Sequence, residues 1–184
     1  MNASTLPRYM EFGVQSNFSF LRAASKPEEL VVAACLLGHA GMGLADRNTL
    51  SGVVRAWSQS KFIPLRMESE PKPFPYHPGA RLVFADGTPD VLAYPQDREG
   101  WGHLCRLLTQ ANMRDESPKG DPRVYRDDIF EWGRRISLAV RADCMAEISR
   151  ERQFIRDLRE RFGASVWIAV ALAFDGSDRL LVPM

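Results

Sequence analysis

The sequence is poor in the side chains from which disulfide frameworks and metal sites are built. Its 184 residues include three cysteines and three histidines. The cysteines stand singly, and an odd number of isolated cysteines argues against a disulfide framework. We therefore expect reduced, buried thiols at these positions, which are Cys35, Cys105 and Cys144.

The histidines also share no spacing that would bring them together. Metal sites need several imidazole, thiolate or carboxylate ligands at fixed separations. We predict no metal site from the three histidines, which are His39, His77 and His103.

The sequence also lacks a charge excess and a long apolar run. It has 24 Lys and Arg against 23 Asp and Glu, for a formal net charge of +1. That balance argues against a dedicated nucleic-acid binder, which is usually strongly basic. No apolar run approaches the roughly 20 residues of a membrane span, and residues 1–7 do not read as a secretory signal. We expect a cytoplasmic protein with no membrane contact.

What the sequence does contain is a regular alternation of apolar strands and amphipathic helices. This pattern is typical of βα units with a parallel sheet, in one domain at this length. Helix caps are predicted at Ser25 (with Glu28 in a capping box), at Asp97 and at Asp143, and a hairpin turn at Asp86-Gly87. The predicted strands span 9–14, 42–45, 81–85, 90–94, 136–140 and 165–171, and further helices span 49–61 and 127–132.

One segment breaks this rhythm. Four prolines are spaced through residues 68–78 and favour an extended, polyproline-like loop, because each ring fixes φ and removes a backbone donor. We interpret the segment as a surface excursion, and a partner-docking loop is the alternative. Its prolines are Pro71, Pro73, Pro75 and Pro78.

Four blocks of the sequence, in order, resemble a known family. The segment 11–21 (EFGVQSNFSFL) is followed by 43–54, by 78–82, and by 89–97 with 101–109. Together they resemble the PHP domain at the N-terminus of bacterial C-family DNA polymerases. The segment 16–21 (SNFSFL) is most similar to the error-prone, damage-inducible branch of that family. The resemblance spans about residues 8–172. It implies an α/β, PHP-like distorted barrel over residues 1–174, incomplete at about two-thirds of seven βα units, with residues 175–184 as an off-family tail.

The same resemblance shows which metal ligands are missing. In metal-binding PHP domains the first block carries His-x-His, the second Asp-His and the third an acid. At these positions the sequence has Gly13 and Gln15, then Asp46 and Arg47, then Arg81. Gly, Gln and Arg are not ligands for first-row metals. Since only Asp46 survives, we predict neither a metal nor a catalytic residue in this chain.

The two arginines at former ligand positions admit two interpretations. A guanidinium can pair with a carboxylate and replace the charge of a metal, so we favour a structural cluster of Arg47 and Arg81 around Asp46. The alternative is a phosphate-binding mouth formed by Arg47 and Arg81. Ser16 and Ser19 have no His–Asp partner in the sequence, and we interpret them as turn and cap residues.

The resemblance finally implies a function. The chain is expected to be a metal-free structural and interaction module of an error-prone polymerase, linked to translesion synthesis and DNA repair. The Mg²⁺-dependent nucleotidyl transfer would belong to the polymerase core, whose carboxylates are not in this chain. The expected partners are that core or other translesion-repair proteins, with DNA contacted only indirectly. The alternatives are a metal-dependent PHP phosphoesterase or 3′–5′ exonuclease, and a free-standing relic without activity.

Overall fold

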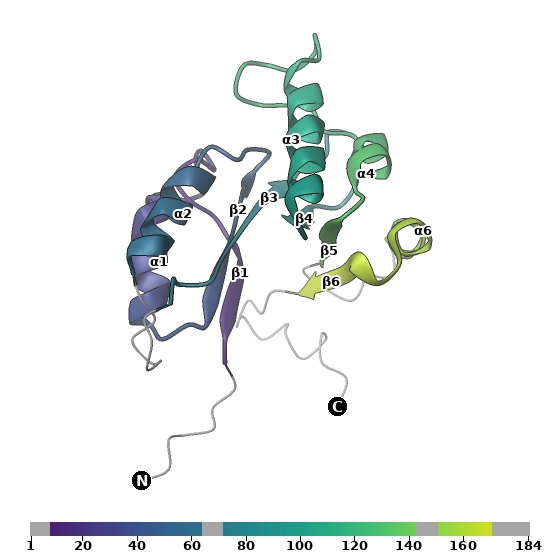
Figure 1. Ribbon diagram of the computed structural model, residues 1–184. Coiled ribbons are helices and arrows are strands. Elements are labelled where there is room, and N and C mark those ends of the chain that lie inside the picture. The colour runs from purple at the N-terminus through teal and green to yellow at the C-terminus, as the bar shows by residue number, and fades with distance from the viewer. Residues whose placement is uncertain (1–7, 64–71, 143–150, 171–184) are drawn as a thin grey trace, which may run out of the picture. The chain divides into compact units, whose positions relative to one another are not determined.

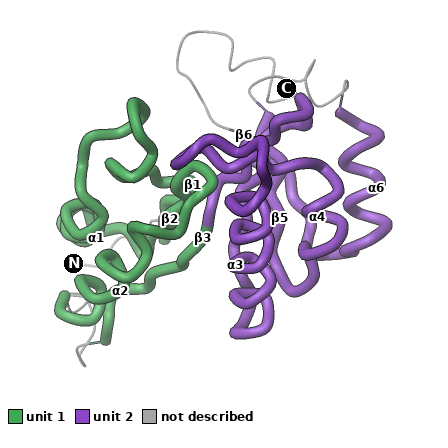
Figure 2. The backbone as a smooth tube through the Cα atoms, turned by 90° about the horizontal axis from the view of Figure 1, so that it is seen from above, with its two compact units in different colours: residues 1–79 green, residues 80–184 purple. Residues whose placement is uncertain are grey.

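The computed structural model describes residues 8–63, 72–142 and 151–170 (Figure 1). The chain divides into two compact units, residues 1–79 and 80–184, and the division falls inside strand β3 (Tyr76–Leu82) (Figure 2). The expected single domain over 1–174 stays a prediction. The expected cap at Asp143, the thiol of Cys144 and the tail 175–184 lie outside the described residues.

The first unit is a parallel strand pair with two helices beside it. Strands β1 (Met10–Val14) and β2 (Gly41–Arg47) pair in parallel. Helices α1 (Pro27–Leu36) and α2 (Val53–Phe62) follow them and lie side by side (Figure 1). A parallel pair needs a crossover connection, which α1 supplies. The core of this unit includes the fully buried side chains of Val31, Met42, Leu44, Ala56 and Phe74.

Helix α1 begins one residue later than the sequence predicted. Its N-cap is Lys26, whose backbone N–H donates to Oε2 of Glu29 at 3.0 Å, so the predicted pairing of Ser25 with Glu28 is wrong. The reason is Pro27. Proline is favoured at the first helical position and forces the preceding residue into an extended conformation, and Lys26 has φ −73° and ψ 151°.

Helix α2 also begins later than predicted, at Val53 rather than residue 49. Asn48 adopts a left-handed φ of 48°, which ends β2 in a turn. The Ser51 N–H then donates to the Thr49 hydroxyl at 3.2 Å. Such local side-chain bonds compete with helix formation, and they keep residues 48–51 out of the helix.

The second unit is built on a mixed sheet. The C-terminal part of β3 pairs antiparallel with β4 (Val91–Pro95), β4 pairs antiparallel with β5 (Ile136–Ala142), and β5 pairs in parallel with β6 (Val166–Val170). The alternate residues 136, 138, 140 and 142 of β5 are buried, as expected for a sheet with one covered face. The helical elements are α3 (Arg98–Asn112), α4 (Arg126–Trp132), α6 (Arg152–Phe162) and the 3₁₀ turn η1 (Gly163–Ser165).

In this region the structure differs from the prediction at the ends of two elements, strand β3 and the hairpin. Strand β3 already begins at Tyr76, so the last residues of the predicted 68–78 loop are a strand. The hairpin joins Arg81 and Leu82 to Leu92 and Val91, as predicted, but the chain then leaves the pair and Phe84 bridges to residue 124 instead. The predicted cap at Asp97 is confirmed, since its Oδ1 accepts the Gly100 N–H at 3.0 Å.

The fold class is therefore mixed α/β, as predicted. No helix within the described residues is long and apolar enough to cross a membrane. Cys35 and Cys105 are free thiols that are half-buried rather than buried, and burial raises the pKa of the Cys105 thiol.

Candidate functional site

The former ligand Asp46 lies at the end of β2, is 1% exposed and accepts three hydrogen bonds. Its Oδ1 accepts the backbone N–H of Ser16 and the hydroxyl of Ser19, each at 2.7 Å. Its Oδ2 accepts the hydroxyl of Ser16, also at 2.7 Å. Both serines are themselves buried. The carboxylate is thus held on both oxygens by donors from the loop after β1.

The loop after β1 is shaped to deliver these donors. The Ser19 N–H donates to the Ser16 carbonyl at 2.8 Å, which closes the Ser16–Ser19 turn, and the Asn17 N–H donates to the Ser25 carbonyl at 2.9 Å across its base. Ser19 Oγ in turn accepts the backbone N–H of Arg47 at 3.0 Å. The Ser16–Ser19–Asp46 network therefore fastens this loop to the end of β2.

Gly52 completes the wall around this network. A Cβ atom on Gly52 would lie 2.9 Å from Oδ2 of Asp46, 2.9 Å from Cγ of Pro27 and 3.2 Å from Cδ2 of Phe18. Only a residue without a side chain fits there. The carboxylate is enclosed by packing as well as by hydrogen bonds.

At the first-block positions the backbone favours glycine over histidine at residue 13. Strand β1 has a register irregularity between Glu11 and Val14, and Gly13 within it has φ 77°. This left-handed conformation is characteristic of glycine in a bulge and disfavours other residues. Gln15 follows the strand and is half-buried. The backbone at residue 13 is thus adapted to glycine.

The two arginines belong to different compact units, and each is described in its own. Arg47 ends β2 and is half-buried. Arg81 lies in β3 and pairs with Asp90, with Nε donating to Oδ2 at 2.7 Å. Serines hold the Asp46 carboxylate, and Asp90 pairs with the Arg81 guanidinium. The cluster of Arg47 and Arg81 around Asp46 stays a prediction. Phosphate binding by Arg47 and Arg81 stays a prediction, and the charge of Arg81 is already paired.

These residues do not fit the metal site that the fold family implies. A first-row metal needs three or more imidazole, thiolate or carboxylate donors converging on one point. Within the described part of the chain, no group of three or more His, Cys, Asp or Glu side chains could hold a metal ion. The one acid at a family ligand position, Asp46, already uses both oxygens to accept hydrogen bonds.

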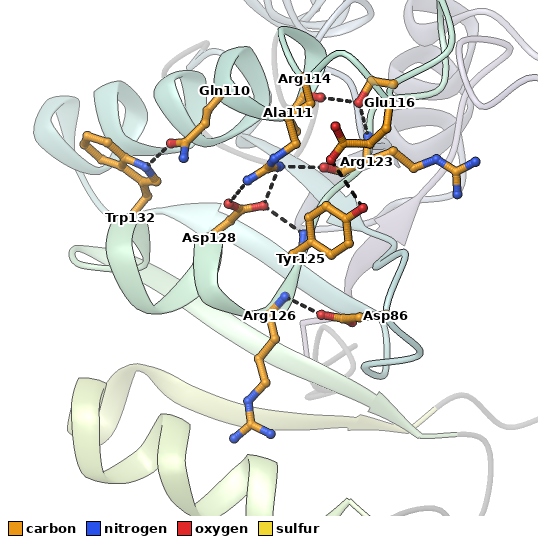
Figure 3. Close-up of polar contacts among 11 residues, drawn as sticks. Asp86, Gln110, Ala111, Arg114, Glu116, Arg123, Tyr125, Arg126, Asp128 and Trp132 are labelled. Atoms are coloured by element: carbon orange, nitrogen blue, oxygen red, sulfur yellow. Dashed lines mark hydrogen bonds and ion pairs between the residues drawn. The ribbon is translucent and has the colours of Figure 1, made fainter.

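A second polar cluster, which the sequence did not reveal, lies in the second unit (Figure 3). The guanidinium of Arg114 donates from both terminal nitrogens to the Asp128 carboxylate, and Nη1 also donates to the carbonyl of Arg123 at 2.6 Å. Asp128 is 2% exposed and accepts the Tyr125 N–H at 2.8 Å. The cluster joins the chain after α3 to the first turn of α4. The N-cap of α4 is Tyr125, and Asp128 lies three residues after it.

Next to this cluster, Asp86 fastens the hairpin turn to α4. Its Oδ2 accepts the backbone N–H of Arg126 at 2.8 Å (Figure 3). Partial burial raises the pKa of Asp86, but hydrogen bonds from Arg126 and Thr88 outweigh it and leave the pKa below its ordinary value. The Arg126 guanidinium pairs with Asp157 of α6 and lies over the Phe154 ring. These contacts tie the hairpin turn and α6 to α4.

Comparison with known proteins identifies the relatives of this chain. No protein-family model matches it. It is 54% identical over 182 residues to the error-prone DNA polymerase of Mesorhizobium japonicum, a match that covers 99% of this chain. It is 44% identical over 172 residues to error-prone DNA polymerase 1 of Rhizobium meliloti, over 93% of this chain. The chain is a homologue of the N-terminal part of error-prone DNA polymerases.

The chain spans only a small part of these error-prone DNA polymerases, 16% of the Mesorhizobium enzyme and 14% of the Rhizobium one. The fold is similar to a crystal structure from Bifidobacterium adolescentis, of a protein assigned as a metal-dependent phosphoesterase. The TM-score is 0.60 at 13% identity, and the match covers 95% of this chain and 82% of that one. At this identity the likeness shows the fold alone, and it confirms the expected PHP-like fold.

Proposed function

We propose that this chain is a metal-free, PHP-like structural module of an error-prone DNA polymerase, which takes part in translesion synthesis and DNA repair. The observation that carries the proposal is the Ser16–Ser19–Asp46 network. It occupies the former ligand Asp46 with three hydrogen bonds and ties the loop after β1 to β2. A carboxylate enclosed in this way stabilises a loop, and both of its oxygens already accept hydrogen bonds.

The arrangement supports no hydrolytic step by this chain's own residues. Hydrolysis of a phosphodiester at a metal site needs a metal-activated water and a clamp on the phosphate oxygens. Gly13, Gln15 and Arg47 supply no ligand for such a metal. Nucleotidyl transfer, with its Mg²⁺, would be carried out by the polymerase core, against which this module would pack.

The test is elemental analysis of the purified chain, paired with hydrolysis of a generic phosphodiester in added Mn²⁺ or Zn²⁺. We expect no stoichiometric metal and no turnover above buffer. Stoichiometric metal, with turnover abolished by Asp46→Asn, would overturn the proposal in favour of a metal-dependent phosphoesterase or 3′–5′ exonuclease. Asp127→Asn, at an exposed carboxylate on α4, is the matched control and should change neither readout.

A further inference from the structure

The loop after β1 carries two large apolar side chains into solvent. Phe20 is 81% exposed and Leu21 is 87% exposed. Leu21 also has a φ of 60°, in the left-handed region that branched and bulky residues avoid. We refer to these two residues as the Phe20–Leu21 tip.

The backbone under this tip is well fixed. Ser16 and Ser19 are buried against Asp46. The Arg22 N–H donates to the Ser19 carbonyl at 2.9 Å, and the Asn17 N–H spans the base of the loop to Ser25. The tip is thus displayed by an ordered frame. An exposed apolar pair contributes little to the stability of the free chain, and residues held in unfavourable backbone conformations cluster at binding and switch regions.

The charges around the tip indicate what would bind there. Two nearby cations are already paired, Lys26 with Glu29 at 3.8 Å and Arg55 with Glu28 at 3.7 Å. The exposed Arg22 follows the tip directly, and among the described residues its guanidinium has no ion-pair partner. A complementary surface would therefore present apolar side chains beside a carboxylate.

A protein segment fits this surface better than a nucleic acid does. Of the two tip residues only Phe20 has a ring that could stack on a base, because Leu21 is aliphatic. The net charge of the chain is only +1, which gives little general attraction to a phosphate backbone.

We propose that the Phe20–Leu21 tip is a docking surface for the remaining part of an error-prone DNA polymerase, through an apolar segment that carries a carboxylate opposite Arg22. This inference rests on the proposed function. In the Mesorhizobium relative, the matched region is 16% of the length, so most of that polypeptide is available as the partner.

The test is co-expression of the full chain with the Mesorhizobium japonicum error-prone DNA polymerase lacking its matched N-terminal region, followed by affinity purification and titration. Leu21→Gly removes the apolar side chain and suits the positive φ, so it should leave the unfolding midpoint unchanged or raise it. Arg22→Glu reverses the charge. We expect each to weaken the complex about ten-fold or more.

Leu37→Ser is the matched control. Leu37 is 73% exposed and follows the C-terminal end of α1, away from the loop that bears the tip. It should bind like the unmodified chain. Equal binding by Leu21→Gly and Arg22→Glu would overturn the inference, and so would the absence of any complex with the unmodified chain.

Two further results would indicate a different partner. Salt-sensitive binding of an oligo-dT probe that Leu21→Gly abolishes would point to single-stranded DNA. Concentration-dependent dimers that Leu21→Gly abolishes would point to a second copy of the chain. Either result would overturn the inference. The metal and hydrolysis assays do not involve these variants, so the proposed function and this inference can fail separately.

Discussion

Asp46 matches a metal-ligand position of the family pattern, and in this chain its carboxylate accepts hydrogen bonds. In metal-binding PHP domains this position supplies a ligand, whereas here its two oxygens accept hydrogen bonds from Ser16 and Ser19. The sequence placed Asp46 correctly at the end of a strand but did not reveal its partners. Serines in turns usually bond to nearby backbone groups. The sequence therefore gives no sign that Ser16 contacts Asp46, thirty residues away.

Removing this carboxylate should destabilise the first unit. Asp46→Ala leaves a buried N–H and two buried hydroxyls without their acceptor, and we expect a loss of about 2–4 kcal/mol in the free energy of unfolding. Asp46→Asn keeps one oxygen acceptor, and the serine hydroxyls can rotate, so its loss should be smaller. Urea titration, monitored by tryptophan fluorescence, measures the free energy of unfolding of both variants. Equal stability of Asp46→Ala and the unmodified chain would contradict the network's structural role.

Gly52 and Gly102 form a matched pair for a second prediction. A Cβ on Gly52 would meet Asp46 and Pro27 at 2.9 Å, whereas one on Gly102 in α3 meets nothing within 4 Å. We expect Gly52→Ala to lower the free energy of unfolding by about 1–3 kcal/mol, because the cavity is already full. Gly102→Ala should raise it by about 0.5–1 kcal/mol, because alanine favours a helix. Thermal unfolding of both variants measures these changes. A Gly52→Ala variant that is more stable than the unmodified chain would contradict the close packing around Gly52.

At the scale of elements, a buried ion pair helps to hold the connection between α3 and α4. Asp128 is buried, and Arg114 is its charged partner. Arg114→Met would leave a buried carboxylate without its counter-charge, and we expect a loss of about 3 kcal/mol or more. Arg106→Met is the control, since Arg106 is an exposed cation over Trp132 and should contribute less than about 1 kcal/mol. Denaturant titration compares the two variants, and equal losses would contradict the assignment.

The Asp97 cap of α3 predicts that the stability of the fold depends on pH. The Arg135 side chain and the Gly100 N–H both donate to Asp97 and lower its pKa. A carboxyl whose pKa is lower in the folded state stabilises the fold above its unfolded pKa of about 4, and this stabilisation is lost as the pH falls through the folded pKa. Asp97→Asn keeps a capping oxygen without the charge. The fall in urea midpoint between pH 7 and pH 3 should therefore be smaller in Asp97→Asn than in the unmodified chain.

The elements themselves were largely predictable, and their ends were not. Apolar alternation located the described strands, and the Asp97 cap was read correctly. The start of α1 moved by one residue because Pro27 imposes an extended residue before it. The start of α2 moved because Asn48 takes a left-handed turn. The Arg114–Asp128 pair joins residues from different elements, and a single sequence carries no signal for such a pairing.

At the scale of the whole molecule, the most apolar exposed strand is β6. Its residues Trp167, Ile168 and Val170 are all exposed, and it pairs with β5 on one side. The described residues include no second partner for its other edge. A strand edge without charge or proline readily pairs with another chain. The resemblance predicted an incomplete barrel, and in the second unit its sheet would end at β6.

A charge on this strand should therefore reduce association between molecules. We expect Ile168→Lys to lower the weight-average mass at high protein concentration and to change the free energy of unfolding little, since Ile168 is 44% exposed. Sedimentation velocity over a concentration series measures the first effect. Val54→Lys, at an exposed apolar position on α2, is the control, and an equal effect of the two would show that the β6 edge is not special.

The left-handed glycine in β1 limits how this chain could acquire a metal site. Placing histidine at residues 13 and 15 would restore the family's side chains, but residue 13 sits at φ 77° in an irregular part of the strand. A histidine there would either strain the backbone or force the strand into a new register. The backbone cost of histidine at residue 13 would come before any metal ligand is gained. A histidine ligand at residue 13 would therefore require a change in the backbone of β1 as well as in the side chain.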